Sequence, residues 1–290
     1  MNRPKLIVMC GLSGSGKSNT AKELAEKYDA EIISSDSIRE EVTGDSMNQS
    51  VNEEVFKIFH DRLRNLLQNQ KRSVIADATN ITLKTRRAIL NKVNGFDIEK
   101  ICYIIATPYK YCLVNNKNRE RSIPEEVIKK QLYRFQVPFK EEGFDEIIIK
   151  RPPSLYIDGF ICARDMVNFD QKNPHHKFDL YDHCMSTAMQ IKELGYSVEY
   201  QKAALLHDIG KLKTQTFDDE GVAHYYQHHC VGAYYMLCQQ VDLDKCFLIN
   251  YHMMPFGWNT EKSRKKWIRI FGEEKFKLLE DFHRCDLEAR

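Results

Sequence analysis

The residues between Gly11 and Ser18 form a glycine-rich loop of the kind that binds phosphate groups. They read GLSGSGKS, which matches the pattern GxxxxGK[ST], between an apolar run and a helical pattern. Glycine lets backbone N–H groups curl around phosphate oxygens, and the N-terminus of the following helix adds positive potential. We expect Lys17 to bridge the β- and γ-phosphates of ATP and the Ser18 hydroxyl to ligate Mg²⁺. The predicted nucleotide contacts of this loop are Gly11, Ser13, Gly14, Ser15, Gly16, Lys17 and Ser18.

Charged side chains follow the next two predicted strands. The first of these strands runs into SSDSIR, which places Asp36 and Arg39 one helical turn apart. Asp36 can accept a proton from an acceptor hydroxyl and Arg39 can hold a phosphate, or Asp36 is only a helix N-cap. The second strand ends in DATN. Here Asp77 holds Mg²⁺ through water, or Thr79 and Asn80 only cap the next helix.

A polar segment with two arginines, NNKNRERSIP, covers residues 115–124. The proline at its end predicts the start of a helix. Arg119 and Arg121 can reach over the γ-phosphate and neutralise the charge that develops during phosphoryl transfer. The alternative is a solvated surface turn.

Together these segments resemble the polynucleotide 5′-kinase branch of the P-loop kinases, over about residues 4–150. The resemblance rests on the glycine-rich loop, SSDSIR, DATN and a lid that reads NNKNRERSIPEEVIKKQLYRFQVP. One departure is Asn115, which stands where an arginine often precedes the lid asparagine. The resemblance implies a general base at Asp36, an acceptor-phosphate contact at Arg39, and lid contacts to ATP phosphates at Arg119 and Arg121. Asp77 and the lid residue Asn116 complete the expected nucleotide contacts.

Residue types that bind metals recur after residue 180, on successive predicted helices. At the centre of the set, His207 and Asp208 are adjacent in LLHDIGK, inside an apolar stretch. Inward side chains from several helices are how helical bundles build metal sites. The alternative is a bundle whose histidines only pack or cap. The six candidate ligands are His183, His207, Asp208, His228, His252 and Asp286, and the nearby thiols Cys184, Cys230 and Cys285 lack zinc-knuckle spacing.

The order H…HD…H…H…D resembles the HD-domain metal-dependent phosphohydrolases, over about residues 174–290. NPHHKFDLYDH, ALLHDIGK and YYQHHCVGA carry the resemblance, with His175 and His176 taken as loop residues. It implies that Lys211 contacts a substrate phosphate, and that His229 is an alternative to His228. It also implies one metal at His183, His207, Asp208 and Asp286, and a second completed by His228 and His252. Nitrogen and oxygen ligands of this kind admit one or two ions of Mn, Fe, Co, Ni or Zn, and we favour two.

The elements that position these residues follow from hydrophobic periodicity. Strand and helix patterns alternate up to residue 150, which predicts an α/β domain with a parallel sheet and helices on both faces. Irregular chain follows, and from about residue 180 the pattern is helical, which predicts an all-α domain. We expect domains at 1–150 and 175–290, with a linker at 151–174. The expected strands are 6–10, 32–33, 74–76, 101–106 and 147–149, and the expected helices of the first domain are 17–28, 51–69, 82–93 and 109–137.

Composition limits the classes of partner. The 290 residues carry 43 basic and 41 acidic side chains, so the net charge is 43 − 41 = +2 and nucleic-acid binding must depend on local patches. No apolar run approaches the roughly 18 residues of a membrane span, and no signal-peptide pattern is present. Nine unclustered cysteines favour a reducing cytoplasm. A candidate strand-binding groove, or else a solvated helix face, contains Lys84, Arg86, Arg87, Lys129, Lys130 and Arg134.

A kinase adds phosphate and an HD enzyme removes it, so their fusion resembles the bifunctional polynucleotide kinase–phosphatases. We expect phosphorylation of 5′-hydroxyl ends and removal of 2′,3′-cyclic or 2′/3′-phosphates, on RNA rather than DNA, with no membrane partner. The products suit a separate ligase. Three alternatives stay open: a nucleoside or sugar kinase fused to a nucleotidase, a toxin-like metabolite kinase, and a non-enzymatic nucleotide-binding module with a structural metal.

Overall fold

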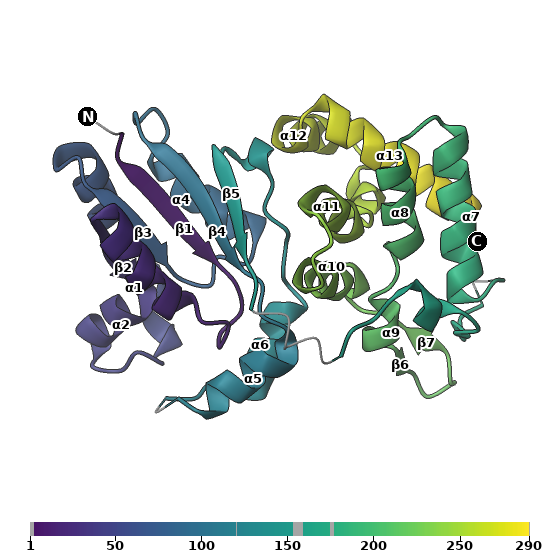
Figure 1. Ribbon diagram of the computed structural model, residues 1–290, viewed down its shortest axis with the longest axis horizontal. Coiled ribbons are helices and arrows are strands. Elements are labelled where there is room, and N and C mark those ends of the chain that lie inside the picture. Colours follow the sequence, from purple (N-terminus) through teal and green to yellow (C-terminus); the bar gives the residue numbers. More distant parts are fainter. Residues whose placement is uncertain (1–2, 120, 153–158, 175–176, 290) are drawn as a thin grey trace. The chain divides into compact units, whose positions relative to one another are not determined.

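The computed structural model describes residues 3–119, 121–152, 159–174 and 177–289. The chain forms two compact units: Met1–Ile128 with Pro138–Pro153, and Lys129–Val137 with Ser154–Arg290 (Figure 1). The sequence-based division assigned residues 129–137 to the first domain, whereas in the structure they pack with the second. Residues 153–158 of the expected linker, and His175 and His176, lie outside the described residues.

The first unit is built on a five-stranded sheet in which all neighbouring strands are parallel, in the order β2-β3-β1-β4-β5. The expected α/β fold and all five expected strands are confirmed. The strands are β1 (Lys5–Cys10), β2 (Ala30–Ser34), β3 (Ser73–Asp77), β4 (Glu99–Ile105) and β5 (Glu146–Lys150).

Helices cover both faces of this sheet. The connection from β1 to β2 and the connection from β3 to β4 run in opposite directions along the strand order. Because such crossovers are right-handed, α1 (Lys17–Tyr28) and α4 (Leu83–Lys92) lie on opposite faces (Figure 1). Helix α3 (Asn52–Arg64) packs beside α4, and α2 (Ser35–Thr43) precedes α3.

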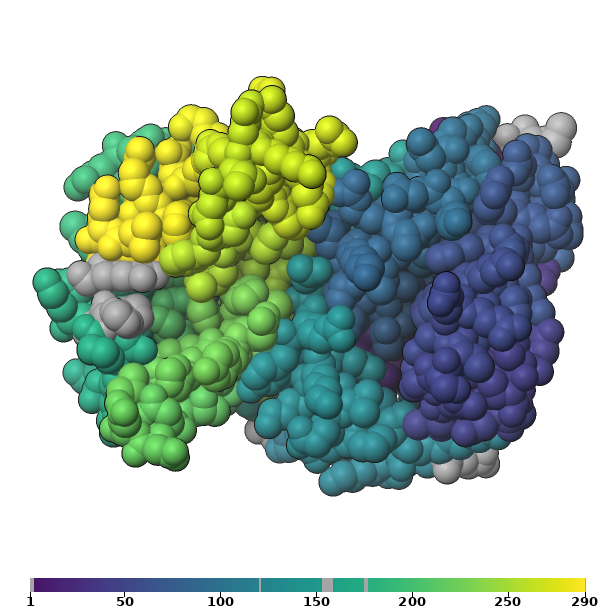
Figure 2. All heavy atoms as spheres, turned by 180° about the vertical axis from the view of Figure 1, so that it is seen from behind, coloured from purple at the N-terminus to yellow at the C-terminus, as the bar shows by residue number. Residues whose placement is uncertain are grey.

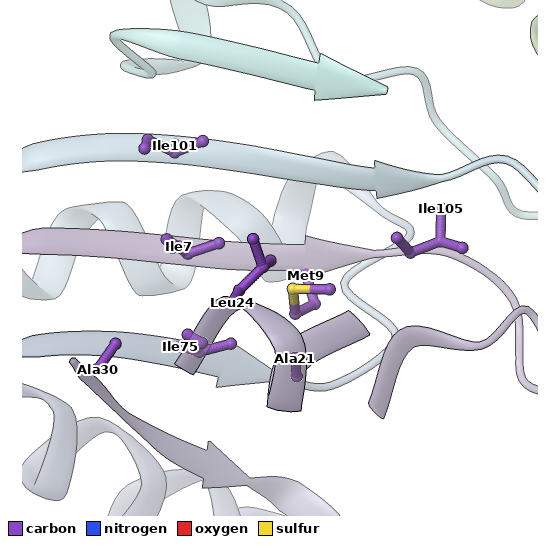
Figure 3. Close-up of a cluster of buried hydrophobic side chains, with 8 residues drawn as sticks. All are labelled: Ile7, Met9, Ala21, Leu24, Ala30, Ile75, Ile101 and Ile105. Atoms are coloured by element: carbon purple, nitrogen blue, oxygen red, sulfur yellow. The ribbon is translucent and has the colours of Figure 1, made fainter. Parts of the chain in front are cut away.

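The core explains why β1 is apolar at every position from Leu6 to Cys10. Ile7 and Met9 point toward Ala21 and Leu24 of α1 (Figure 3), while Val8 is equally buried. A strand that is covered on both faces has no solvent side, so its sequence does not alternate.

Two expected helices are interrupted. The helix expected at 51–69 ends as α3 at Arg64 and continues as the π-helical turn Asn65–Asn69. The helix expected at 109–137 is split into α5 (Tyr109–Lys117) and α6 (Glu125–Leu132). Pro124 lies directly before α6, where its missing N–H and fixed φ suit a helix start and prevent a continuous helix.

The second unit is helical, as expected, with one short β-hairpin. Helix α7 packs on α8 and α13, and α10 packs on α11 (Figure 1). No helix among the described residues is long and apolar enough to span a membrane. The elements are α7 (Leu180–Glu193), α8 (Val198–Leu206), α9 (Lys211–Thr214), β6 (Thr216–Phe217), β7 (Ala223–His224), α10 (His228–Cys238), α11 (Leu243–Tyr251), α12 (Glu261–Phe271) and α13 (Glu273–Glu288).

Residues 129–137 are held in this unit by the end of α11. The Val137 N–H donates to Asn250 Oδ1 at 2.9 Å, and Asn250 Nδ2 donates to the Phe135 carbonyl at 3.1 Å. The Tyr251 hydroxyl donates to the Val137 carbonyl at 3.0 Å. These buried bonds satisfy backbone groups that would otherwise be costly to bury.

We therefore expect Asn250→Leu to lower the free energy of unfolding of this unit by about 2–4 kcal/mol, because it leaves two buried backbone groups unpaired. Tyr251→Phe, which removes one bond, should cost only about 1 kcal/mol. Urea unfolding followed by tryptophan fluorescence measures both, since Trp258 and Trp267 belong to the second unit. An Asn250→Leu protein that unfolds at the wild-type urea concentration would contradict this account.

Candidate functional site

The glycine-rich loop joins β1 to α1 and depends on close backbone contacts. A Cβ atom at Gly14 would lie 2.1 Å from the carbonyl oxygen of Cys112, and Gly14 and Gly16 have φ angles of 81° and 96°. The Gly11 N–H donates to the Thr79 carbonyl at 3.0 Å. Glycine is thus required at these positions for the shape of the loop, independently of any ligand.

Lys17 and Ser18 begin α1 beside the end of β3. The Lys17 Nζ donates to the Leu12 carbonyl of the loop at 2.8 Å, and burial lowers the pKa of this lysine. The Ser18 hydroxyl donates to Asp77 Oδ2 at 2.9 Å. Burial raises the pKa of Asp77, while the charge of Lys17 opposes that shift. The adjacent hydroxyl and carboxylate fit the preference of Mg²⁺ for oxygen ligands.

Asp36 and Arg39 face each other on α2. Arg39 Nη1 lies 2.8 Å from Asp36 Oδ1, with side-chain exposures of 4% for the arginine and 77% for the aspartate. Arg39 also donates to the Ser46 carbonyl and to Asn52 Oδ1. The N-cap of α2 is Ser34, whose side chain accepts from the Ser37 N–H. Ser34, and not Asp36, therefore caps α2, and the Asp36 carboxylate stays accessible.

In the lid, each predicted residue has a different environment. Arg121 Nη1 lies 2.5 Å from Glu40 and donates to the Ser46 hydroxyl, so it contacts the α2 region. The positive charge of Arg119 contributes to a lower pKa for both Lys17 and Asp77. The Asn116 side chain donates to the Ile123 carbonyl and accepts from the Ile123 N–H, which braces the lid loop.

Two positioning residues were not predicted from the sequence. Asn115 Nδ2 donates to the Gly14 carbonyl at 2.9 Å, and the Thr107 hydroxyl donates to the Ser15 carbonyl at 2.8 Å. Both side chains thus donate hydrogen bonds to backbone carbonyls of the phosphate-binding loop and help to fix its shape. The departure from the kinase pattern at Asn115 was the only signal that pointed to either residue.

The expectation that Arg86 lines a strand-binding groove is wrong. Its side chain is fully buried and forms an ion pair with Glu142 at 2.7 Å. Arg86 Nη1 also donates to the Asn80 carbonyl at 3.2 Å. Asn80 in turn donates to the Met9 carbonyl, so this pair supports the turn after β3. Lys84, Lys129, Lys130 and Arg134 are exposed, and Arg87 is half-buried.

In the second unit, the six predicted ligands come from five helical segments and are all buried. His183 lies in α7, His207 and Asp208 directly follow α8, and His228 begins α10. His252 directly follows α11, and Asp286 lies in the last turns of α13.

The ligand atoms form two groups that share Asp208. Asp208 Oδ2 lies 3.5 Å from His183 Nε2 and 3.4 Å from His207 Nε2, and Asp286 Oδ1 lies 3.1 and 3.5 Å from the same two nitrogens. Asp208 Oδ1 lies 2.9 Å from His228 Nε2 and 3.5 Å from His252 Nε2. Atoms that bind one ion at about 2.1 Å lie about 3.0–3.4 Å apart at angles of roughly 90–109°. These spacings therefore suit a metal in each group.

Hydrogen bonds orient all four imidazoles in the same sense. Each Nδ1 faces a backbone carbonyl: Ala289 at 3.2 Å, Ala204 at 2.7 Å, Tyr225 at 2.9 Å and Ile249 at 2.9 Å. A carbonyl only accepts, so each Nδ1 carries a proton and each Nε2 faces the cluster, where it offers its lone pair to a metal when the ring is neutral. Four convergent lone pairs beside two carboxylates fit a cation, and this is the usual outer support of a metal-bound histidine.

Neighbouring charges and burial shift the pKa values of residues in this cluster. Burial alone would raise the pKa of Asp208, but the charges of His207 and Lys211 hold it well below the usual value. Burial lowers the pKa of His252 to about 4, so this ring is neutral at pH 7. Lys211 Nζ lies 2.6 Å from Asp208 Oδ2 and donates to Gln171 Oε1, a partner that the sequence did not suggest.

The structure distinguishes between the two neighbouring histidines. His228, but not His229, belongs to the ligand clusters found among the described residues, and those clusters contain no cysteine. Burial lowers the pKa of His229 well below its usual value.

Comparisons with known proteins agree with the two-part architecture. Residues 6–138 match the family described as "AAA domain", and residues 180–280 match the "HD domain" family. L-seryl-tRNA(Sec) kinase of Methanococcus maripaludis is 29% identical over 147 residues, which cover 48% of this chain and 56% of the kinase. The chain thus spans about half the length of this curated relative. A P-loop kinase domain implies ATP and Mg²⁺, and an HD domain implies a divalent metal.

Solved structures with related folds include a chain of the Pnkp1/Rnl/Hen1 RNA repair complex. It is 25% identical, with 45% of this chain and 43% of that chain covered and a TM-score of 0.39. A fungal RNA kinase is 16% identical, with coverage of 51% and 76% and a TM-score of 0.39. A gluconokinase from Sinorhizobium meliloti is 17% identical, with coverage of 51% and 83% and a TM-score of 0.38.

Because Asp208 presents one oxygen to each group, we expect the protein to bind two Mn²⁺ ions per chain after reconstitution. His252→Ala should reduce the content to one ion, since it removes a ligand from one group only. His224→Ala is the matched control, because His224 pairs with Asp218 outside the cluster. Elemental analysis measures all three proteins, and one ion in the wild type would rule out the second site.

Proposed function

We propose that this chain, which joins a P-loop kinase domain to an HD domain, repairs nucleic-acid ends. The kinase domain transfers the γ-phosphate of ATP to a 5′-hydroxyl, and the HD domain removes a 2′,3′-cyclic, 2′- or 3′-phosphate. The observation that carries the proposal is that one chain combines a glycine-rich loop beside Lys17, Ser18 and Asp77 with a buried cluster of histidines and aspartates. The first set of residues suits the addition of a phosphate, and the second suits the removal of one.

In the kinase reaction, the Asp36 carboxylate takes the proton of the 5′-hydroxyl as its oxygen attacks the γ-phosphorus. The bond between the γ-phosphorus and the β,γ-bridging oxygen breaks, and ADP leaves. Lys17 and the loop N–H groups stabilise the charge on the phosphate oxygens, with Arg119 and Arg121 contributing from the lid. Ser18 and Asp77 would hold the Mg²⁺ of the nucleotide.

Arg39 supports an acceptor that carries its own phosphate. Its guanidinium is buried and held by three partners, and its Nε makes no hydrogen bond to any described residue. A fixed, buried guanidinium beside the proposed base suits the phosphate that follows the first nucleoside of a strand. A plain sugar or nucleoside offers no anion for this side chain.

In the hydrolytic reaction, the six ligands would hold one or two divalent ions of Mn, Fe, Co, Ni or Zn. Such ions, when bound, act as Lewis acids on the phosphate ester. Lys211 places its ammonium group beside Asp208, and the side chain can move so that this group contacts a substrate phosphate. Gln171 positions this ammonium group.

The proposed products indicate the next reaction. A 5′-phosphate and a 3′-hydroxyl are the ends that a ligase joins, so a separate ligase is the proposed partner. Cyclic phosphates require a neighbouring 2′-hydroxyl, which favours RNA over DNA as the substrate.

The role of Asp36 is tested by Asp36→Asn, which keeps the shape and removes the base. We expect the rate of 5′ phosphorylation to fall about 10²–10⁴-fold, the usual contribution of a general base. Asp97→Asn is the control, because Asp97 is an exposed aspartate that also faces an arginine, Arg3. If Asp36→Asn keeps most of the rate of phosphate transfer, the assignment of the base is wrong.

The proposed function as a whole is tested with an RNA that has a 5′-hydroxyl and a 2′,3′-cyclic phosphate. The wild type, given ATP, Mg²⁺ and Mn²⁺, should change both ends. Asp208→Ala should lose processing of the 3′ end by about 10³-fold and keep the kinase, and Lys17→Ala should do the reverse, because each site has its own electrostatics. Separation of labelled products by gel shows both ends.

The outcomes of this test separate the rival functions. Phosphorylation of a free nucleoside but not of the RNA would point to a small-molecule kinase. An Asp208→Ala protein that melts cooperatively but has lost both activities would contradict two independent sites.

A further inference from the structure

An open groove of about 560 Å³ runs between α3 and α4 on the sheet face opposite α1. Figure 2 shows the molecule from behind, with the side of the first unit that carries these helices. The wall that α3 forms in this groove includes Asn52, Phe56 and His60, which are four residues apart and so lie on one face of the helix. Phe56 and His60 have no role in the proposed kinase chemistry, and Asn52 enters it only as a hydrogen-bond partner of Arg39.

One end of the groove lies at the acceptor site. Asn52 Oδ1 accepts a hydrogen bond from Arg39 Nη2 at 2.9 Å, and Asn52 lines the groove. Arg39 is the residue proposed to hold the first phosphate of the acceptor. A strand bound there would have its next nucleotides beside the start of α3.

The groove carries a surplus of positive charge. Lys57, Lys84 and Lys92 line it, together with Glu53 and Asp61. In the described part of the chain, none of the three lysines forms an ion pair, so their charges remain available to a ligand. Unpaired cations along a groove are the electrostatic pattern that follows a phosphate backbone.

The groove also offers flat rings. Phe56 and His60 are half-buried, and both pack against the buried ring of Phe59, at centroid distances of 5.9 and 5.8 Å. Burial and the charge of Lys92 lower the pKa of His60, so its ring is neutral at pH 7. Supported rings next to cations are the two components of sites that bind single strands without reading their sequence.

We infer that the α3–α4 groove binds the acceptor strand beyond its first phosphate, with bases on Phe56 and His60 and phosphates at Lys57, Lys84 and Lys92. The inference rests on the proposed kinase function and names its substrate class as a strand of several nucleotides. From Asn52 to His60 the helix rises about 12 Å, which spans about three to four nucleotides at the stacked spacing of about 3.4 Å. The groove is therefore long enough for such a strand.

The test is the kinetics of the full-length kinase on 5′-hydroxyl RNAs of two, four and ten nucleotides, measured by the initial rate of ADP formation. All acceptors end in a 3′-hydroxyl, so that the HD domain has no terminal phosphate to remove. For the wild type, KM should fall with length. Lys84→Ala/Lys92→Ala should raise KM for the ten-nucleotide RNA about tenfold and leave the dinucleotide unchanged.

Salt dependence gives a second readout of the same variant. Each phosphate contact to a single strand contributes about 0.7 to the slope of log KM against log salt concentration, so the double variant should lower this slope by about 1.4. The control is Lys22→Ala/Lys27→Ala, which removes the same charge from α1 on the other face and should change neither value. Phe56→Leu, which keeps the packing but removes the ring, should raise KM for the ten-nucleotide RNA at least about fivefold.

Three results would overturn the inference. One is a wild-type KM that does not change with acceptor length. Another is a lysine double variant with wild-type KM and salt slope on the ten-nucleotide RNA. The third is an equal loss on the dinucleotide, which would assign these residues to the reaction centre or to stability. A wild type that phosphorylates no RNA would instead refute the proposed kinase function.

Discussion

The buried carboxylate of Asp208 lies among four imidazole nitrogens and one ammonium group, and the helical unit is arranged around it. An isolated carboxylate at this depth would cost several kcal/mol, so the helices that deliver its partners must converge. Gly210 permits the convergence, because a Cβ there would lie 2.0 Å from the His228 carbonyl. The same contacts that make Asp208 tolerable in the interior also aim both of its oxygens at histidine pairs.

In the kinase domain, the polar groups that need partners are the backbone groups of the phosphate-binding loop. This loop must expose N–H groups to an anion while keeping its own carbonyls satisfied, and the neighbouring elements supply that support. Asn115 and Thr107 donate to the carbonyls of Gly14 and Ser15, and the turn after β3 accepts from Gly11. Behind this turn lies the buried Arg86–Glu142 ion pair. The phosphate cradle is thus held in shape from outside, which reduces the reorganisation that a ligand has to induce.

The two structural units do not coincide with the two domains expected from the sequence. Residues 129–137 comprise the end of α6 and the chain that follows it, and periodicity alone assigns them to the kinase domain. Their backbone is instead hydrogen-bonded to Asn250 and Tyr251, next to the candidate ligand His252. A single asparagine in an apolar helix carries no pattern that names its partner, so contacts between segments over a hundred residues apart are invisible without the fold.

The sequence by itself determined the two fold classes, the five strands, the phosphate-binding loop and the six candidate metal ligands, Asp208 among them, that the structure brings together. These depend on local pattern: glycine where the backbone needs freedom, apolar runs where a strand is covered on both faces, and ligand residues at helix spacing. Only the tertiary structure decided that Arg86 is buried with Glu142, that Ser34 rather than Asp36 caps α2, and that His228 rather than His229 joins the cluster. The physical reason is that burial, pairing and the direction of a ring depend on which neighbours a side chain acquires, and those neighbours come from distant parts of the chain.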